Sequence, residues 1–297
     1  MAQTVVGDYR STRSASVGLR RALGRAALYT IAILLGFLLF APILWGLISS
    51  FKPDTEIKLL PPVIFPSRWV PQNYVDVWTT KLFGVWTQNS VFIAVLATIG
   101  TVLTAALSGY SFARFRYPGR GVLFGLTIAT LMLPDIVTLV PRFILFWELG
   151  WLNTYLPLIV PYWFGGTAFF IFLFRQFFMT IPTDLDEAAK IDGASYFQIF
   201  ARIVLPLSGP VMATVAIIAF IDQWNSFLFP LTILNSPEKF TVSIGLRWFA
   251  ISPSADSRPL DQLLLAGSMM MMAPIMVIFF CGQRYFVRGV VMSGIKG

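Results

Sequence analysis

Apolar and polar positions follow one another along this chain in long blocks. Six mostly apolar stretches of about 20 residues are separated by shorter polar or proline-rich segments. A helix of about 20 residues is long enough to cross the ~30 Å hydrocarbon core of a bilayer. The pattern therefore predicts six transmembrane helices, at about 26–49, 89–113, 121–141, 154–174, 209–230 and 262–283.

The composition agrees with a membrane protein. Of 297 residues, 57% are hydrophobic and 12% are charged, whereas soluble domains carry about 25% charged residues. We predict an all-α integral membrane protein whose transmembrane domain spans residues 26–283, with its core at about 85–283. Residues 1–25 and 284–297 are then polar tails.

Near the N-terminus, an apolar run is followed by a segment rich in proline and tryptophan. The uncharged run from Ala26 to Phe51 is longer than the 7–15 apolar residues of a secretory signal, so we expect a span and no cleavage. Residues 50–88 contain five prolines and three tryptophans, which excludes a spanning helix and favours an external loop. That loop either meets a substrate-binding protein or forms an aromatic belt at the membrane surface.

The distribution of basic residues predicts the orientation. Fourteen of the 22 Lys and Arg residues lie in the two tails, in the loop 114–120 and in the polar segment that follows Phe174. The other eight lie in the loops on the opposite side. The positive-inside rule therefore places both termini and the segment 181–208 in the cytoplasm of a cell membrane.

The polar segment Thr183–Pro210 contains signals for two short helices. Thr183 and Asp186 resemble a capping box, so the first helix is expected at about 184–192. Gly193 is expected to end it with positive φ. Ser195 and Gln198 form a second capping box. The second helix presents an apolar face and is expected to stop at Pro206; the face consists of Phe197, Phe200, Ala201 and Val204.

This segment is acidic, although a helix that rests on anionic lipid is usually basic. Four carboxylates outnumber Lys190 and Arg202. A protein partner therefore explains the segment better than lipid does. On the pattern alone, a plain connecting or interfacial loop stays an alternative.

The same segment resembles the EAA loop of ABC importer permeases. Glu187-Ala188-Ala189 is followed after three residues by Gly193 and then, after nine more, by Ile203-x-Leu205-Pro206. The run from Asp192 to Ser195 is similar to the carbohydrate-uptake branch, which includes the smaller permease subunit of the maltose transporter. The similarity extends from about Asn73 to Gly297.

This resemblance implies a six-helix type I importer permease with a cytoplasmic EAA loop at 181–208. Such a chain pairs with a second homologous permease, two ATPase subunits and an extracytoplasmic sugar-binding protein. The ATPase-coupling residues would be Glu187, Ala188, Ala189, Asp192, Gly193, Ile203, Leu205 and Pro206. The C-terminal tail resembles an extension that reaches between the ATPase subunits; alternatively, it is simply a solvated basic tail.

We expect a transport subunit and not an enzyme. The chain has no histidine and a single cysteine, Cys281, which excludes Ser-His-Asp triads and an intrachain disulfide. None of its six lysines is followed by Ser or Thr, as a Walker A motif requires. We therefore expect no cofactor or metal on this chain, with ATP and Mg²⁺ on the partner ATPase, and no nucleic acid partner.

Asp135 and Asp222 are the two carboxylates inside predicted spans, where an acid normally faces the bundle interior or a watery cavity. Asp222 is followed by Trp224 and Asn225, which suit a sugar-binding path: the indole stacks on a sugar ring and the amide binds its hydroxyls. Alternatively, these groups join neighbouring helices. Asp135, next to Pro134, also marks a helix break.

The hypothesis is thus a permease subunit of an ATP-driven carbohydrate importer. One alternative is an ABC permease for another solute, such as a peptide or polyamine. A second is a secondary carrier driven by protons or sodium, in which Asp222 titrates, although such carriers typically contain inverted repeats. The sequence does not name the sugar or tell which permease of the pair binds it.

Overall fold

A computed structural model describes residues 5–79, 82–165, 167–251 and 260–294, without the side chains of 5–22, 248, 251 and 284–294. The described residues form helices joined by loops, with no β-strand among them. The chain divides into two compact units, Met1–Val70 and Pro71–Gly297. The division falls in the proline-rich segment before Pro71, and the core predicted at about 85–283 lies within the second unit.

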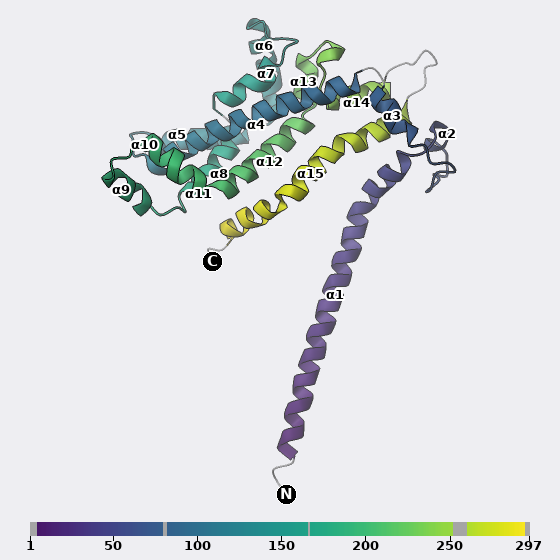
Figure 1. Cartoon of the computed structure of the whole chain (residues 1–297), viewed down its shortest axis with the longest axis horizontal. Coiled ribbons are helices and arrows are strands. Elements are labelled where there is room, and N and C mark those ends of the chain that lie inside the picture. Colours follow the sequence, from purple (N-terminus) through teal and green to yellow (C-terminus); the bar gives the residue numbers. More distant parts are fainter. Residues whose placement is uncertain (1–4, 80–81, 166, 252–259, 295–297) are drawn as a thin grey trace. The chain divides into compact units, whose positions relative to one another are not determined.

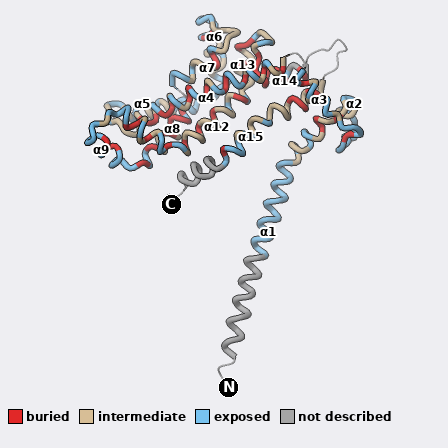
Figure 2. The backbone as a smooth tube through the Cα atoms, in the orientation of Figure 1, coloured by how far each residue is buried: buried red, intermediate tan, exposed pale blue. Residues whose placement is uncertain are grey.

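Unit 1 consists of the long helix α1 (Val5–Ser49), the short helix α2 (Asp54–Ile57) and a loop. The backbone of α1 is helical from Val5, so the predicted tail continues the first span as helix. Every described side chain of α1 up to Phe40 is exposed (Figure 2). The loop is closed by Lys52, whose Nζ donates to Ser49 Oγ (2.9 Å) and to the Val63 carbonyl (2.7 Å).

Unit 2 is a helical bundle with α9 and α10 at one end and α13 and α14 at the other (Figure 1). Its elements are α3 (Gln72–Thr79), α4 (Phe83–Arg114), α5 (Arg120–Ala129), η1 (Thr130–Met132), α6 (Asp135–Glu148), α7 (Leu156–Ile159), η2 (Val160–Trp163), α8 (Ala168–Phe178), α9 (Asp184–Ile191), α10 (Tyr196–Ile199), the π-helix η3 (Phe200–Val204), α11 (Leu205–Leu207), α12 (Gly209–Asn225), α13 (Leu228–Ile233), η4 (Pro237–Lys239), α14 (Val242–Ile251) and α15 (Asp261–Gly294).

The helix α4 is the centre of unit 2 and packs against both α8 and α12. Its buried positions are mostly small, which lets neighbouring backbones approach closely: Ala94, Ala97, Gly100, Ala105, Ala106 and Gly109. A Cβ on Gly109 would lie 2.7 Å from Phe174 Cβ and 3.0 Å from the Arg175 nitrogen. The α4–α8 contact thus depends on the missing side chain at Gly109.

Two apolar clusters fill the two ends of the bundle. One lies at the α13–α14 end and includes Trp86, Trp224 and Phe249. The other lies at the α9–α10 end, where Phe174, Phe178 and Phe200 pack around α4. This second cluster extends to Ala189 and Val204, so the polar segment after α8 rests on the core of the bundle.

By length and composition, four helical stretches are able to cross a membrane: Leu23–Ser49, Phe83–Arg114, Leu156–Phe178 and Asp261–Gln283. Two further pairs qualify only if each bent pair is one span. In the first, Arg120–Met132 and Asp135–Glu148 meet at 102°. This confirms the break predicted at Pro134 and Asp135. Since proline cannot continue a helical hydrogen-bond ladder, the chain turns there.

The span predicted at 154–174 corresponds to the stretch Leu156–Phe178, but its helix is interrupted. The helical turns α7 and η2 end at Trp163, and α8 begins only at Ala168, beyond extended backbone at Thr167. Pro161 and the glycine at Gly165 explain the interruption, because proline lacks an N–H and glycine favours non-helical backbone.

The segment after α8 forms two short helices, as predicted. Of the two predicted capping boxes, one is present and one is absent. Ser195 and Gln198 make the expected capping box, and Gly193 follows α9 with φ of 81°. Thr183 makes no side-chain capping bond and has helical backbone angles. The backbone N–H of Asp186 donates to the Thr183 carbonyl at 2.9 Å instead, and the Asp186 carboxylate pairs with Arg114.

Pro206 does not stop the second helix, which continues through Leu207 and turns at Ser208. The π-helical turn η3 precedes it, and Pro206 then falls in the first turn of α11, where a missing N–H is tolerated. The predicted apolar face is only partly buried: Phe200 and Val204 are buried, whereas Phe197, on the first turn of α10, is 71% exposed.

At the α13–α14 end of the bundle, Asn153 connects two loops through hydrogen bonds. Its φ is 58°. Its Oδ1 accepts hydrogen bonds from the backbone N–H groups of Asn235 and Ser236, both at 3.1 Å. Lys239 Nζ donates to its carbonyl at 2.7 Å. These bonds tie the turn after α6 to the loop between α13 and η4.

We predict that Gly109→Ala destabilises unit 2. The added methyl group collides with Phe174, and overpacking of this kind costs about 1–3 kcal/mol. Thermal unfolding in detergent is expected at a lower temperature than for the wild type. Gly84→Ala is the matched control on the same helix, because nothing lies within 4 Å of its added Cβ. Equal melting temperatures for both variants would contradict the close α4–α8 contact.

Candidate functional site

A cavity of about 580 Å³ lies in unit 2 where several helices are interrupted. Asp135 begins α6 directly after the bend, Tyr162 and Thr167 flank the break before α8, and Asp222 lies on the last turn of α12. Thr101 enters from the middle of α4. Interrupted backbone at membrane depth is tolerated where it lines a cavity, so the breaks in the sequence build this site.

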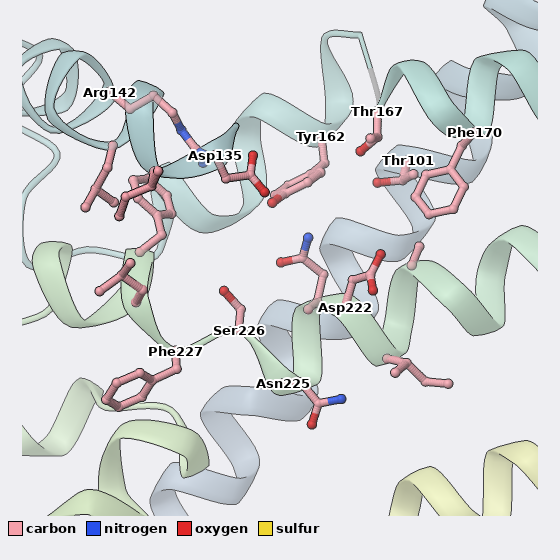
Figure 3. A pocket seen from close by; sticks show the side chains of 17 residues that line it. Thr101, Asp135, Arg142, Tyr162, Thr167, Phe170, Asp222, Asn225, Ser226 and Phe227 are labelled. Carbon is pink, nitrogen blue, oxygen red and sulfur yellow. The ribbon is translucent and has the colours of Figure 1, made fainter. Parts of the chain in front are cut away.

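The two carboxylates expected in a substrate path line the same cavity. Asp135 and Asp222 come from different elements, and Figure 3 shows both side chains, with Tyr162 and Thr101, turned toward one space. Both aspartates are exposed to this space. Their oxygens accept hydrogen bonds, whereas the hydroxyls of Tyr162 and Thr101 both donate and accept.

Trp224 is not where the sugar-path hypothesis needs it. Its side chain is 1% exposed and its Nε1 donates to the Met271 carbonyl on α15 at 3.0 Å. It also stacks on Phe220, with ring centroids 5.8 Å apart. The helix direction explains this: Trp224 follows Asp222 by two residues and so points to the other side of α12. In this conformation Trp224 joins α12 to α15, which is the alternative role considered for these polar groups.

Asn225 lines the edge of the cavity, but its amide points away from the two carboxylates (Figure 3). Gln223 and Ser226 also line the cavity. Sequence reasoning missed most of the remaining wall, which includes Thr101, Arg142, Tyr162, Thr167, Phe170, Phe227 and Phe229. Only Arg142 carried a usable signal, a charge at the end of a predicted span.

Arg142 introduces a positive charge into the cavity wall. Its guanidinium lies 3.9 Å from the ring centroid of Phe229, a cation–π contact that orients it. The cavity thus combines two acids, one base, several hydroxyls and aromatic faces. Binding sites for polyhydroxylated ligands use polar groups of this kind together with apolar walls.

The EAA segment presents only part of its motif to the outside. Glu187, Ala188, Asp192, Gly193 and Pro206 are exposed. Ala189 is buried, while Ile203 and Leu205 pack against the aromatic cluster at this end of the bundle. These three therefore contribute to packing within the chain in this conformation, and the coupling role of the eight motif residues stays a prediction. Ala189, Ile203 and Leu205 face inward because they fasten α9 and α11 to the bundle.

Exposed apolar side chains extend the outer face of this segment. Ile191 is 87% exposed and Phe197 is 71% exposed, one on each side of the glycine turn. Exposed apolar residues beside polar ones are typical of protein contacts. Sequence reasoning missed Ile191 because it belongs to no motif. Beside this face lies a hollow of about 760 Å³, lined by Arg116, Arg120, Glu187, Lys190 and Tyr196 among others.

A helical membrane bundle with broken spans around a polar cavity and an exposed loop at one end defines a transport permease. The chain belongs to the family described as binding-protein-dependent transport system inner membrane component, whose model matches residues 100–292. The family assignment agrees with the resemblance at Glu187–Pro206 and places the protein in the inner membrane.

Several relatives cover nearly the whole chain. An arabinooligosaccharides transport system permease protein, AraQ, of Halalkalibacterium halodurans is 35% identical, over 89% of this chain and 93% of the relative. A diacetylchitobiose uptake system permease protein, NgcG, of Streptomyces coelicolor is 34% identical, over 90% and 87%. An sn-glycerol-3-phosphate transport system permease protein, UgpE, of Yersinia enterocolitica is 34% identical, over 89% and 95%.

A solved structure shares the fold. The crystal structure of a bacterial ABC transporter involved in the import of the acidic polysaccharide alginate aligns with a TM-score of 0.77. The alignment covers 90% of this chain and 97% of the other at 22% identity. The chain therefore has the type I ABC importer permease fold, as the sequence predicted.

We predict that Asp222→Asn lowers uptake per assembled complex by about tenfold, because a hydrogen bond to a charged group contributes about 1.5–3 kcal/mol. Assembly and basal ATP hydrolysis are expected to stay at wild-type levels. Glu148→Gln, at the exposed end of α6, is the matched control. If uptake by Asp222→Asn falls only in proportion to the amount of protein, Asp222 supports the bundle and not the path.

Proposed function

We propose that this chain is one permease subunit of an ATP-driven carbohydrate importer. The observation that carries the proposal is its similarity, over most of its length, to permeases of arabinooligosaccharide and diacetylchitobiose systems. The cavity around Asp135 and Asp222 supports it, since hydroxyls, carboxylates and aromatic faces are groups that bind saccharides. This subunit would form one side of the translocation path.

The other side of the path would come from a second, homologous permease. Two ATPase chains on the cytoplasmic face would bind ATP and Mg²⁺, and an extracytoplasmic binding protein would deliver the sugar. Support for the binding protein comes from the family description. A structure of the alginate transporter was also solved in complex with its periplasmic protein and an alginate pentasaccharide.

The exposed face of α9 and α10 is the proposed ATPase contact. Glu187 suits a charge-assisted bond to a basic group, and Ile191 with Phe197 suits an apolar groove. Gly193 gives the turn between them its positive φ. ATP-driven closure of the ATPases would then move this face and shift the permease between inward- and outward-facing states.

Transport of a non-sugar solute is the second candidate, because a relative of similar identity belongs to an sn-glycerol-3-phosphate system. A phosphate ester is an anion, and Asp135 and Asp222 would repel it within the cavity. Arg142 compensates for one of these charges only. The charge balance therefore favours a neutral saccharide.

We expect both termini and the EAA segment in the cytoplasm, from the excess of basic residues on that side. Alkaline phosphatase fused after Gly297 should be inactive, because the enzyme needs the oxidising exterior to form its disulfides. A fluorescent protein fused at the same position should be bright. Active phosphatase at this position would reject the arrangement of six spans.

The proposed function is tested by co-purification of the complex and by screening sugars for stimulation of ATP hydrolysis in its presence. We predict that Glu187→Lys and Gly193→Leu both reach the membrane at normal levels but lose ATPase subunits. The first inverts a charge at the contact, and the second places a bulky side chain where positive φ costs about 1 kcal/mol or more.

The matched control is Gly36→Ala on α1, far from the EAA segment in the sequence and with open space for a Cβ. Sugar binding to the separate binding protein should not change in any variant. Wild-type ATPase stoichiometry together with wild-type uptake in both EAA variants would disprove the coupling role. Stimulation by sn-glycerol-3-phosphate and by no sugar would favour the second candidate.

A further inference from the structure

A buried ion pair joins the EAA segment to the central helix of the bundle. Arg114, the last residue of α4, places its Nε 3.0 Å from Oδ2 of Asp186 on α9, and the two side chains are 7% and 9% exposed. Arg114 Nη2 also donates to the carbonyl of Ile181 at 2.8 Å. The Arg114 guanidinium thus contacts both α9 and the segment between α8 and α9.

Removing either partner of this ion pair is expected to destabilise the protein. Arg114 Nε and the second carboxylate oxygen of Asp186, Oδ1, are both buried and make no hydrogen bond among the described residues, so the contact is an ion pair held by charge. The carboxylate therefore depends on Arg114 for compensation of its charge. Removing one partner of a buried pair leaves an uncompensated charge, which costs far more than the pair itself contributes.

Both residues of the ion pair line the hollow of about 760 Å³ beside the EAA segment, and an aromatic cluster lies next to Arg114 on α4. Tyr110, one turn earlier on α4, packs on Phe200 and Phe178 with ring centroids 5.0 and 6.2 Å away. Phe115, next to Arg114, packs on Tyr110 at 5.4 Å. Charges attract each other more strongly at a buried position of this kind than in bulk water.

The helix that carries Arg114 also reaches the cavity. The helix α4 is continuous from Phe83 to Arg114, and Thr101 of the same helix lines the cavity with Asp135 and Asp222. Thirteen residues of helix separate the two positions, a distance of about 20 Å. A rigid helix transmits displacement over this length.

A second connection runs through the chain itself and is bent. From α9 it passes the glycine turn at Gly193 and the π-helical turn η3, and it then meets α12 at an angle of 80°. Each of these features is a place where backbone angles change easily. The ion pair adds a direct contact between α9 and α4 that bypasses these bends.

We propose that Arg114 and Asp186 are positioning residues that fasten α9 to α4, so that movement of α9 displaces α4 and with it the wall of the cavity. The inference rests on the proposed coupling function of the EAA segment. It assigns the transmission to a specific contact inside this chain, distinct from the outer face that binds the ATPase.

The test is the amount of sugar imported per ATP hydrolysed by the reconstituted complex. Asp186→Asn and Arg114→Gln are each expected to lower this ratio by about threefold or more, the size seen for residues in coupling networks. ATPase stoichiometry should stay at the wild-type value, which separates this effect from loss of docking. The double variant should fall no further than the worse single variant, because the two residues form one link.

Two further variants serve as controls. Asp184→Asn removes an exposed carboxylate from the same helix and should leave the ratio unchanged. Arg114→Lys keeps a positive charge near Asp186 and should retain most of the ratio. An unchanged ratio in Asp186→Asn, additive losses in the double variant, or loss of bound ATPase would each overturn the proposal. Loss of ATPase in Glu187→Lys tests docking independently.

A measurement that leaves the pair intact covers the case in which these variants fail to fold. Spin labels at Asp184→Cys on α9 and Leu107→Cys on α4, in a Cys281→Ser background, report the distance between the two helices. Both labelled positions are exposed. The distance should stay constant between the nucleotide-free and ATP-trapped complexes. A change in it would show that α9 moves independently of α4 and would overturn the proposal.

Discussion

The structure depends on one constraint: backbone N–H and C=O groups that face hydrocarbon need partners within the chain. A helix satisfies this condition, and a broken helix satisfies it only where protein or a watery cavity covers the break. The interruptions at Pro134, between Trp163 and Ala168, and after Asn225 all adjoin the same cavity. The functional site is thus the place where the interruptions are tolerated, and the polar side chains beside them share that environment.

The second requirement is close packing around α4. Because lipid tails are as apolar as leucine, burial of apolar side chains does not hold membrane helices together. Close packing of the helix backbones stabilises the bundle instead. Glycine and alanine on α4 allow this close packing. Because α4 packs against both α8 and α12, a displacement of α4 affects two walls of the cavity at once. This property makes α4 suited to connect the EAA segment to the site.

The sequence predicted features that depend on local chemistry. Four of the six apolar blocks coincide with helical stretches long and apolar enough to cross a membrane, Pro134 located the sharp bend, and the capping box at Ser195 and the positive φ at Gly193 were both correct. It did not predict features that depend on neighbours. The capping bond of Thr183 is absent because the Asp186 N–H bonds to the Thr183 carbonyl, and Phe197 stays exposed on the first turn of α10 while Phe200 and Val204 are buried. Trp224 and Ala189 belong to motifs, yet packing turned them inward.

The relatives of this chain belong to transport systems for different solutes, so membership of the family does not by itself identify the substrate. At about one-third identity, systems for arabinooligosaccharides and for sn-glycerol-3-phosphate are equally related to this chain. What they share is the backbone, including the breaks. What differs must lie in side chains, and charge is the strongest discriminator within a confined space of low dielectric constant. Two carboxylates facing one arginine give this cavity an excess negative charge. An anionic solute would lose its hydration there without compensation, whereas the hydroxyls of a neutral saccharide would replace water at both carboxylates.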